Sequence, residues 1–204
     1  MKKLLFILTF CFTSSIFADE TLVKISKDLP YFYTYHQGKK IKVARIQDPQ
    51  NRLNDDYTKT SRECPPFCIH PIRVNDKVET IGELEFIKYM QDKDALIVDA
   101  RLKSWYDLET IPSAVNIPYN LFENSDQKKI DSLLKLLGKS NGDFKNAKTL
   151  VLFCNGIWCD QSPRLIKNLI KYGYPPSKLK YYRNGFQGWK IFGLTTVVLK
   201  ENKR

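Results

Sequence analysis

The sequence predicts a mixed α/β protein with a mostly parallel central sheet. Two apolar runs, residues 95–100 (ALIVDA) and 148–154 (KTLVLFC), are bounded by polar residues. Continuous runs of this kind are typical of parallel strands that are buried on both faces. Helix-like segments alternate with these runs along the second half of the chain, and such an alternation is typical of an α/β domain.

A small strand-rich extension is predicted before the α/β part. Short β-like runs occupy residues 21–26, 31–35 and 41–46, and turn-forming residues separate them. Residues 61–72 (SRECPPFCIHPI) contain three prolines, which restrict the backbone. We expect this last segment to be ordered and irregular.

Three helices are predicted in the α/β part. Thr80 is a candidate N-cap, with Glu83 as its partner in a capping box. Residues 132–138 (SLLKLLG) end at a glycine that can stop a helix. Residues 162–173 begin with Ser162 as a candidate N-cap, followed by a proline that suits the first helical position. The remaining strand-like runs lie at residues 179–183 and 195–199.

The first eighteen residues have the composition of a secretory signal peptide. Lys2 and Lys3 make the start positive, and residues 4–12 form an apolar stretch that is too short to span a bilayer. Small residues precede a plausible cleavage point after Ala18, so we expect export to the periplasm or the exterior, and no membrane contact after cleavage. The expected units are a signal peptide (1–18), an extension with short strands and the CPPFC segment (19–76), and an α/β domain (77–204).

The charge of the chain limits the classes of partner. The formal net charge is +11, and it falls to +9 when Lys2 and Lys3 leave with the signal peptide. The remaining basic residues are scattered, whereas a nucleic-acid footprint requires a stripe or a recognised motif. We therefore expect no nucleic acid partner and a modest attraction for small anions. No pattern in the sequence indicates an oligomeric state.

Four cysteines remain after cleavage, and they form two local pairs, Cys64 with Cys68 and Cys154 with Cys159. An exported chain meets an oxidising environment in which disulfides form. Four cysteines allow three complete pairings, and the sequence does not choose among them. Their spacing does not follow the usual pairs of zinc ligands, so we expect no metal and no other cofactor.

Cys154 is the candidate nucleophile. It stands where an apolar strand is predicted to end, and sites of open α/β sheets form at the carboxyl ends of strands. Loop amides and a helix N-terminus lower the pKa of a thiol placed there, although a buried structural cysteine would have the same sequence environment. The loop residues expected to bind the transferred group are Asn155, Gly156, Ile157, Trp158, Asp160, Gln161 and Ser162.

Four segments, in order, resemble the rhodanese-like sulfurtransferase domain. They are LIVDAR (96–101), TIPSAVNIP (110–118), VLFCNG (151–156) and YYRNGFQGW (181–189), and the resemblance covers about residues 77–200. It implies a three-layer α/β/α fold, with Cys154 as the nucleophile that accepts a sulfane sulfur. It also implies that Asp99 and Arg101 give structural support near the site. The CPPFC and CNGxWC motifs resemble an exported group within this family.

The sequence departs from the family pattern at several positions. Ser113 and Asn184 stand where the family has glycine, and Thr110 stands where it has histidine. The family loop reaches its helix about six residues after the cysteine, whereas Ser162 is eight residues after Cys154, which predicts an enlarged loop. Asp160, six residues after the cysteine, replaces the arginine of related phosphatases, so phosphatase activity is not expected.

Three functions are consistent with these residues. The first is sulfur transfer through a persulfide on Cys154, from a small anionic sulfur donor to a thiol or protein acceptor. The second is a thiol–disulfide oxidoreductase or redox sensor, in which Cys159 resolves Cys154. The third is a non-catalytic binding module with structural disulfides. Cys64 and Cys68 can be a redox pair in the second or a structural bridge in any of the three. Of the two histidines, His36 and His70, His70 could reach the site only if its segment folds over it, and we expect it at the surface or at a cap.

Overall fold

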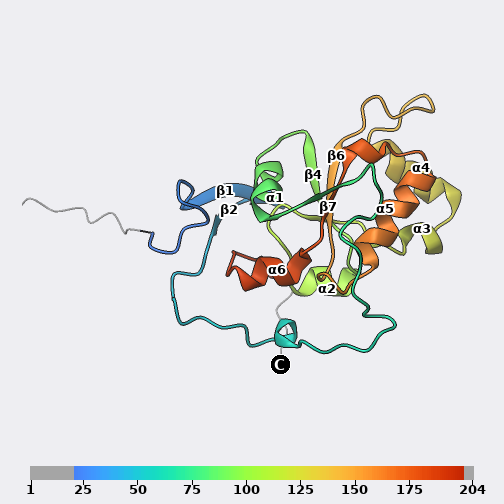
Figure 1. Ribbon diagram of the computed structural model, residues 1–204. Coiled ribbons are helices and arrows are strands. Elements are labelled where there is room, and N and C mark those ends of the chain that lie inside the picture. The colour runs from blue at the N-terminus through green and yellow to red at the C-terminus, as the bar shows by residue number, and fades with distance from the viewer. Residues whose placement is uncertain (1–20, 200–204) are drawn as a thin grey trace, which may run out of the picture.

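The computed structural model describes residues 21–199 (Figure 1). The expected signal peptide and the last five residues lie outside this range. Within it, no helix is long and apolar enough to cross a membrane.

Two sheets organise the chain. The first is an antiparallel pair of strands, β1 (Tyr31–His36) and β2 (Lys39–Ala44). The second has five parallel strands in the order β3-β7-β6-β4-β5. Its strands are β3 (Glu79–Ile81), β4 (Ala95–Asp99), β5 (Val115–Asn116), β6 (Thr149–Phe153) and β7 (Leu179–Tyr182).

Helices cover both faces of the parallel sheet, and two separate hydrophobic clusters lie beneath them. One face carries α1 (Glu83–Met90), α2 (Lys103–Leu108) and α6 (Gly185–Ile191). The other carries α3 (Leu121–Asn124), α4 (Gln127–Leu136) and α5 (Gln161–Lys171). Two 3-10 turns complete the chain, η1 (Asp56–Thr58) and η2 (Pro176–Lys178).

The sheet residues alternate between the two clusters. Val151 and Phe153 of β6 face one cluster, and Leu150 and Leu152 face the other. Because both faces are buried, each strand reads as a continuous apolar run, and this burial explains the pattern that predicted them. The predicted mixed α/β class and its three layers are confirmed.

The extension packs onto the same core. Phe32 of β1, Val43 of β2 and Tyr57 of η1 belong to the cluster beneath α1, α2 and α6. His36 also points inward and is 5% exposed. Its ring lies beside that of Tyr106, and burial lowers the pKa of its imidazole.

All three predicted helices begin at positions other than those predicted, and for α1 and α5 the N-cap residue differs. Thr80 is part of β3, and Gly82 takes the N-cap position of α1, where the Glu85 carboxylate accepts from its N–H. Pairing of residues 79–81 with β7 outweighs the local cap signal. The N-cap of α5 is Asp160, two residues before Ser162. The loop therefore reaches its helix six residues after the cysteine, and the predicted enlargement is wrong.

Two predicted strands are absent from the described chain. Residues 21–26 form only an isolated bridge between Ser26 and Leu29, and residues 195–199 only one between Thr110 and Val197. Neither segment has a neighbouring strand with which it forms a continuous ladder. Helix α4 begins at Gln127, five residues earlier than predicted, because Asp126 accepts from the Lys129 N–H and caps it.

The N-terminus of α6 is held against the cysteine loop through Gly185. This residue has a φ of +60°, and a Cβ there would lie 2.4 Å from the Cys154 carbonyl oxygen. The N–H groups of Phe186 and Gln187 donate to the carbonyls of Cys154 and Asn155, each at 2.8 Å. A side chain at this position would therefore separate the loop from the helix.

Two of the departures from the family pattern have a clear structural setting. Asn184 has an ordinary φ of −64°, so a side chain fits where the family has glycine. Ser113 has a φ of +67°, in the region that glycine enters most readily. A small polar residue holds this conformation here at some conformational cost.

We expect Gly185→Ala to destabilise the protein much more than Gly142→Ala. Both glycines have positive φ, but a Cβ at Gly142 would meet nothing within 4 Å. The left-handed backbone alone should cost Gly142→Ala about 1–2 kcal/mol. The collision with the Cys154 carbonyl should add roughly 1–3 kcal/mol for Gly185→Ala. Urea unfolding measures both, and equal losses would contradict this role for Gly185.

Candidate functional site

Cys154 lies at the carboxyl end of β6, where several hydrogen-bond donors and one acceptor, the Cys159 carbonyl at 3.2 Å, surround its sulfur. Its side chain is 2% exposed. The Ser162 hydroxyl donates to Cys154 Sγ at 3.1 Å, and the N–H groups of Ser162 and Gly156 also point at this sulfur. Ser162 lies in the first turn of α5, whose N-terminal dipole favours a negative charge at the same place.

The two loop cysteines have opposite acidities. Burial raises the pKa of Cys154, but donation from the Cys159 thiol, the Ser162 hydroxyl and two backbone amides outweighs it, so the pKa is lowered. The pKa of Cys159 is raised well above its ordinary value, by burial and by the neighbouring Cys154. The arrangement therefore favours a Cys154 thiolate beside a Cys159 thiol, and both cysteines are free.

The predicted loop residues divide into two groups. Gly156 and Ser162 contact the nucleophilic sulfur, and the Asn155 amide donates to Cys159 Sγ at 3.8 Å. Ile157 and Trp158 instead pack against the two cysteines, and the backbone N–H of Gln161 points at Cys159 Sγ. Trp158 Nε1 donates to Gln187 at 2.8 Å, and Asp160 forms an ion pair with Arg164 at 3.8 Å.

Residues 62–70, which we call the cover, lie over this loop. The Arg62 guanidinium sits 3.9 Å from the centre of the Trp158 ring, and the Phe67 ring packs against Trp158 edge-on at 5.5 Å. The His70 N–H donates to the Ile157 carbonyl at 3.0 Å. The cover contacts Trp158 and Ile157, which themselves pack against Cys154, and Cys154 is almost inaccessible.

A disulfide between Cys64 and Cys68 lies within the cover, with a Cα–Cα distance of 4.7 Å. The Arg183 side chain donates to the His70 carbonyl at 2.6 Å and ties the end of the cover to the domain. His70 thus meets the loop through its backbone. Only one of the two cysteine pairs is bridged. The hypothesis that both pairs form structural disulfides is therefore wrong.

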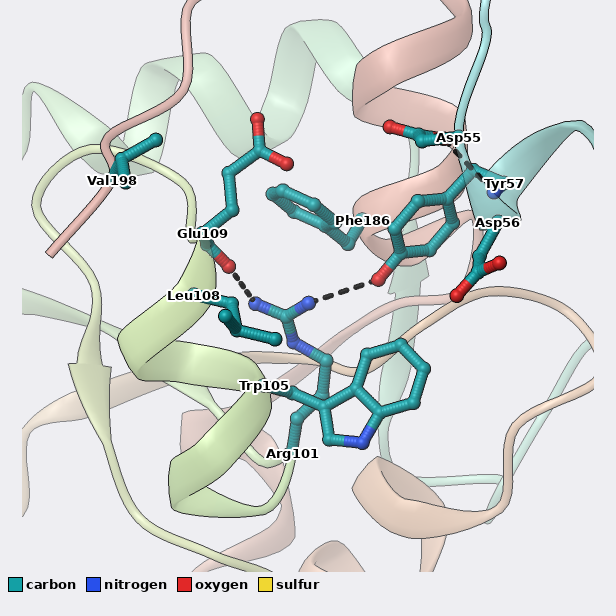
Figure 2. A pocket seen from close by; sticks show the side chains of 9 residues that line it. All are labelled: Asp55, Asp56, Tyr57, Arg101, Trp105, Leu108, Glu109, Phe186 and Val198. Carbon is teal, nitrogen blue, oxygen red and sulfur yellow. Dashed lines mark hydrogen bonds between the residues drawn. The ribbon is translucent and has the colours of Figure 1, made fainter. Parts of the chain in front are cut away.

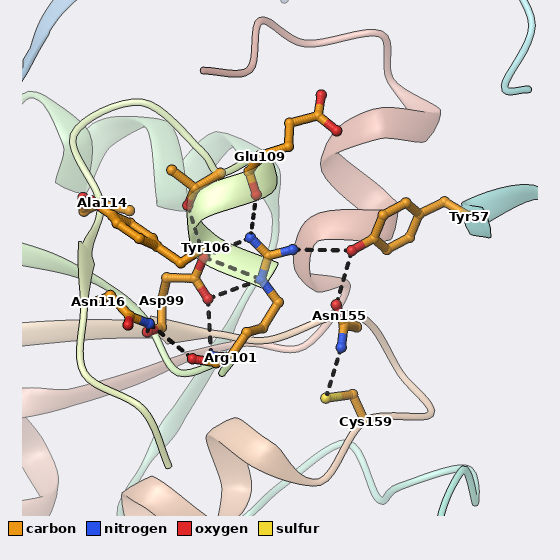
Figure 3. Close-up of polar contacts among 10 residues, drawn as sticks. Tyr57, Asp99, Arg101, Tyr106, Glu109, Ala114, Asn116, Asn155 and Cys159 are labelled. Atoms are coloured by element: carbon orange, nitrogen blue, oxygen red, sulfur yellow. Dashed lines mark hydrogen bonds and ion pairs between the residues drawn. The ribbon is translucent and has the colours of Figure 1, made fainter. Parts of the chain in front are cut away.

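Asp99 and Arg101 form a fully buried ion pair behind the loop (Figure 3). The Arg101 guanidinium donates to Asp99 at 2.7 Å, to the Tyr57 hydroxyl at 3.0 Å and to the Glu109 carbonyl at 2.6 Å. Tyr57 in turn donates to the Asn155 Oδ1 at 2.9 Å. The pair therefore supports the cysteine loop through Tyr57.

Sequence reasoning missed Tyr57, Arg62 and Gln187. Gln187 links three parts of the site, since its backbone N–H donates to Asn155 and its side chain bonds both Trp158 and the Tyr57 carbonyl. The only available signal for Tyr57 was a lone aromatic residue in a polar stretch. No periodicity marks such a residue as buried.

A cavity of about 380 Å³ lies next to the ion pair (Figure 2). It is lined by Asp55, Asp56, Tyr57, Arg101, Trp105, Leu108, Glu109, Phe186 and Val198. This lining holds none of the cysteine-loop residues 154–162. Across residues 21–199, no cluster of three or more His, Cys, Asp or Glu side chains is arranged to hold a metal ion.

Comparison with known proteins gives a family match and a more distant relative. The family model described as "Rhodanese-like domain" matches residues 84–191. An uncharacterized protein of Buchnera aphidicola subsp. Schizaphis graminum is 27% identical over 124 residues, which cover 61% of this chain and 73% of the relative.

Similar solved structures include the human single-domain sulfurtransferase TSTD1 and the BH2092 protein of Bacillus halodurans. The first is 20% identical, with a TM-score of 0.43, and the match covers 56% of this chain and 96% of that one. The second is 17% identical, with a TM-score of 0.45, and covers 59% and 77% respectively.

We expect Ser162→Ala to raise the pKa of Cys154, because the thiolate loses its hydroxyl donor. Loss of a hydrogen bond to a charged group changes an equilibrium constant, here that of thiol ionisation, by roughly tenfold or more. Alkylation of Cys154 at neutral pH should therefore slow by about tenfold. Its pH profile should move to higher pH. Ser132→Ala, in exposed α4, is the matched control and should leave the profile unchanged.

We expect Phe67→Ala, combined with Arg62→Ala, to expose Cys154. Loss of the aromatic pair and the cation–π contact should weaken closure of the cover and speed alkylation by about tenfold. Ile69→Ala is the control, because Ile69 lies in the same segment with its side chain 77% exposed. If the double variant and the control react at the wild-type rate, the cover does not limit access.

Proposed function

Because the chain belongs to the rhodanese-like domain family, we propose that it is a sulfurtransferase that carries sulfane sulfur as a persulfide on Cys154. The observation that carries the proposal is the donor cradle around a cysteine whose pKa is lowered. A thiolate is the nucleophilic form of cysteine, and a cradle that stabilises it also stabilises a persulfide anion. We further propose that the protein acts outside the cytoplasm, after export.

In the first half-reaction, the Cys154 thiolate attacks the outer sulfur of a small anionic donor such as thiosulfate. A bond forms between Cys154 and that sulfur, the sulfur–sulfur bond of the donor breaks, and sulfite leaves with the electron pair. In the second, the thiolate of an acceptor attacks the outer sulfur of the persulfide, and Cys154 leaves as a thiolate. Ser162 and the Gly156 amide stabilise the anion at each stage.

Access to Cys154 requires the cover to move. The nucleophile is 2% exposed, and Trp158 and the cover lie over its loop. A donor or acceptor therefore has to displace the cover before reaction. The scattered positive charge of the protein gives a modest general attraction for anionic donors.

A second candidate function, thiol–disulfide exchange, is favoured by one contact. Cys154 Sγ lies 3.2 Å from the Cys159 carbonyl, and both side chains belong to one buried cluster, so the two cysteines share one small site. If Cys159, as a thiolate, attacks the inner sulfur of the Cys154 persulfide, a Cys154–Cys159 disulfide forms and hydrosulfide leaves. An external dithiol then reduces this disulfide and restores both thiols.

We expect Cys154→Ser to abolish thiocyanate formation from thiosulfate and cyanide, because no persulfide can form. Cys159→Ser should retain this activity and should accumulate the persulfide, which intact mass detects as one added sulfur atom. A wild-type protein that forms no thiocyanate from any sulfane donor but cycles a model disulfide would exclude the first function and favour the second.

A further inference from the structure

Tyr57 connects the buried ion pair to the second loop cysteine, although it belongs to the extension (Figure 3). Its ring packs edge-on against Phe186 at 5.2 Å, and its hydroxyl is buried. The hydroxyl accepts from Arg101 at 3.0 Å and donates to Asn155 Oδ1 at 2.9 Å. The Asn155 amide nitrogen donates to Cys159 Sγ at 3.8 Å.

The direction of this chain of hydrogen bonds is fixed by its first member. A guanidinium group has only donors, so the Tyr57 oxygen must accept from Arg101 and use its single hydrogen toward Asn155. Burial raises the pKa of Tyr57, which keeps that hydrogen in place. Asn155 therefore presents its carbonyl to Tyr57 and its NH₂ group to Cys159.

The orientation of Asn155 matters because an amide has two chemically opposite ends. The NH₂ end stabilises a negative charge on a nearby sulfur, whereas the carbonyl end destabilises it. The Asn155 backbone is already held, since its carbonyl accepts from Gln187 at 2.8 Å. The Gln187 side chain also donates to the Tyr57 carbonyl at 2.9 Å, which fixes Tyr57 relative to the loop.

We propose that Tyr57 is a positioning residue for Cys159: it orients the Asn155 amide so that this amide stabilises the Cys159 thiolate when Cys159 attacks Cys154. The inference rests on the second function proposed above. Cys159 needs such support, because it is 4% exposed and lies beside another sulfur that carries negative charge. The extension therefore acts on the chemistry of the loop as well as covering it.

Tyr57→Phe tests the proposal, because it removes the hydroxyl and keeps the ring. Tyr106→Phe is the matched control: Tyr106 is buried in the same cluster, and its hydroxyl donates to the Ala114 carbonyl at 3.1 Å. For each variant, the alkylation rates of Cys154 and Cys159 are measured against pH by mass spectrometry. Hydrosulfide release is then compared with persulfide loading from thiosulfate.

In Tyr57→Phe we expect the Cys159 profile to move to higher pH, and the ratio of hydrosulfide release to persulfide loading to fall by about tenfold. Tyr106→Phe should match the wild type in both. Asn155→Ala should give the same change, and the double variant Tyr57→Phe/Asn155→Ala should add nothing further, because the two residues act through one bond.

An unchanged Cys159 profile in folded Tyr57→Phe would overturn the proposal. So would an additive double variant, since additivity means that Tyr57 does not act through Asn155. If the wild type forms no persulfide, sulfur transfer fails as a function, but the Cys159 profile still tests Tyr57. The two failures are therefore distinguishable.

Discussion

The buried charge of Arg101 is the constraint on which the site depends. A guanidinium group that is 1% exposed is strongly destabilising unless acceptors surround it. Asp99, the Tyr57 hydroxyl and the Glu109 carbonyl supply those acceptors, and the Phe186 ring lies 4.3 Å beneath the guanidinium. These partners come from the end of β4, the extension, the end of α2 and the start of α6. Satisfying one charge therefore aligns four separate parts of the chain, two of which hold the cysteine loop.

The sequence contains most of the information for the α/β core, because double-sided burial leaves a strong local signal. The residues at which the helices begin are harder to predict from the sequence. Ser162 and Pro163 resemble a cap followed by a first helical residue, yet α5 begins at Gln161. Proline is tolerated at the third position because the first four N–H groups of a helix have no partner within it. The Ser162 hydroxyl is then free to donate to Cys154, so a residue that looks like a cap serves the nucleophile.

The parts of the site contributed by the extension could not be predicted in this way. Tyr57 and Arg62 meet the loop through contacts between residues far apart in the chain, and neither lies in a periodic segment. His36 is another example: its strand was anticipated, but its inward face is decided by packing against Tyr106. A histidine is a polar residue, so its type gives no local sign of burial. These positions are decided by packing between residues far apart in the chain, and no single segment of the sequence shows it.

Covering the loop and stabilising the thiolate involve different atoms. Arg62, Phe67 and the His70 amide bind Trp158 and the Ile157 carbonyl, whereas the thiolate is held by donors on the loop itself and on α5. The cover can consequently lift without breaking a hydrogen bond to Cys154. A thiol with a low pKa is readily oxidised when it is exposed. Because the contacts that cover the loop are separate from those that stabilise the thiolate, the cover can protect Cys154 without reducing its reactivity. Gln187 joins the two, because it bonds Trp158 on one side and the Tyr57 carbonyl on the other. Trp158, which the cover contacts, is therefore linked through Gln187 to Tyr57, whose hydroxyl bonds Asn155.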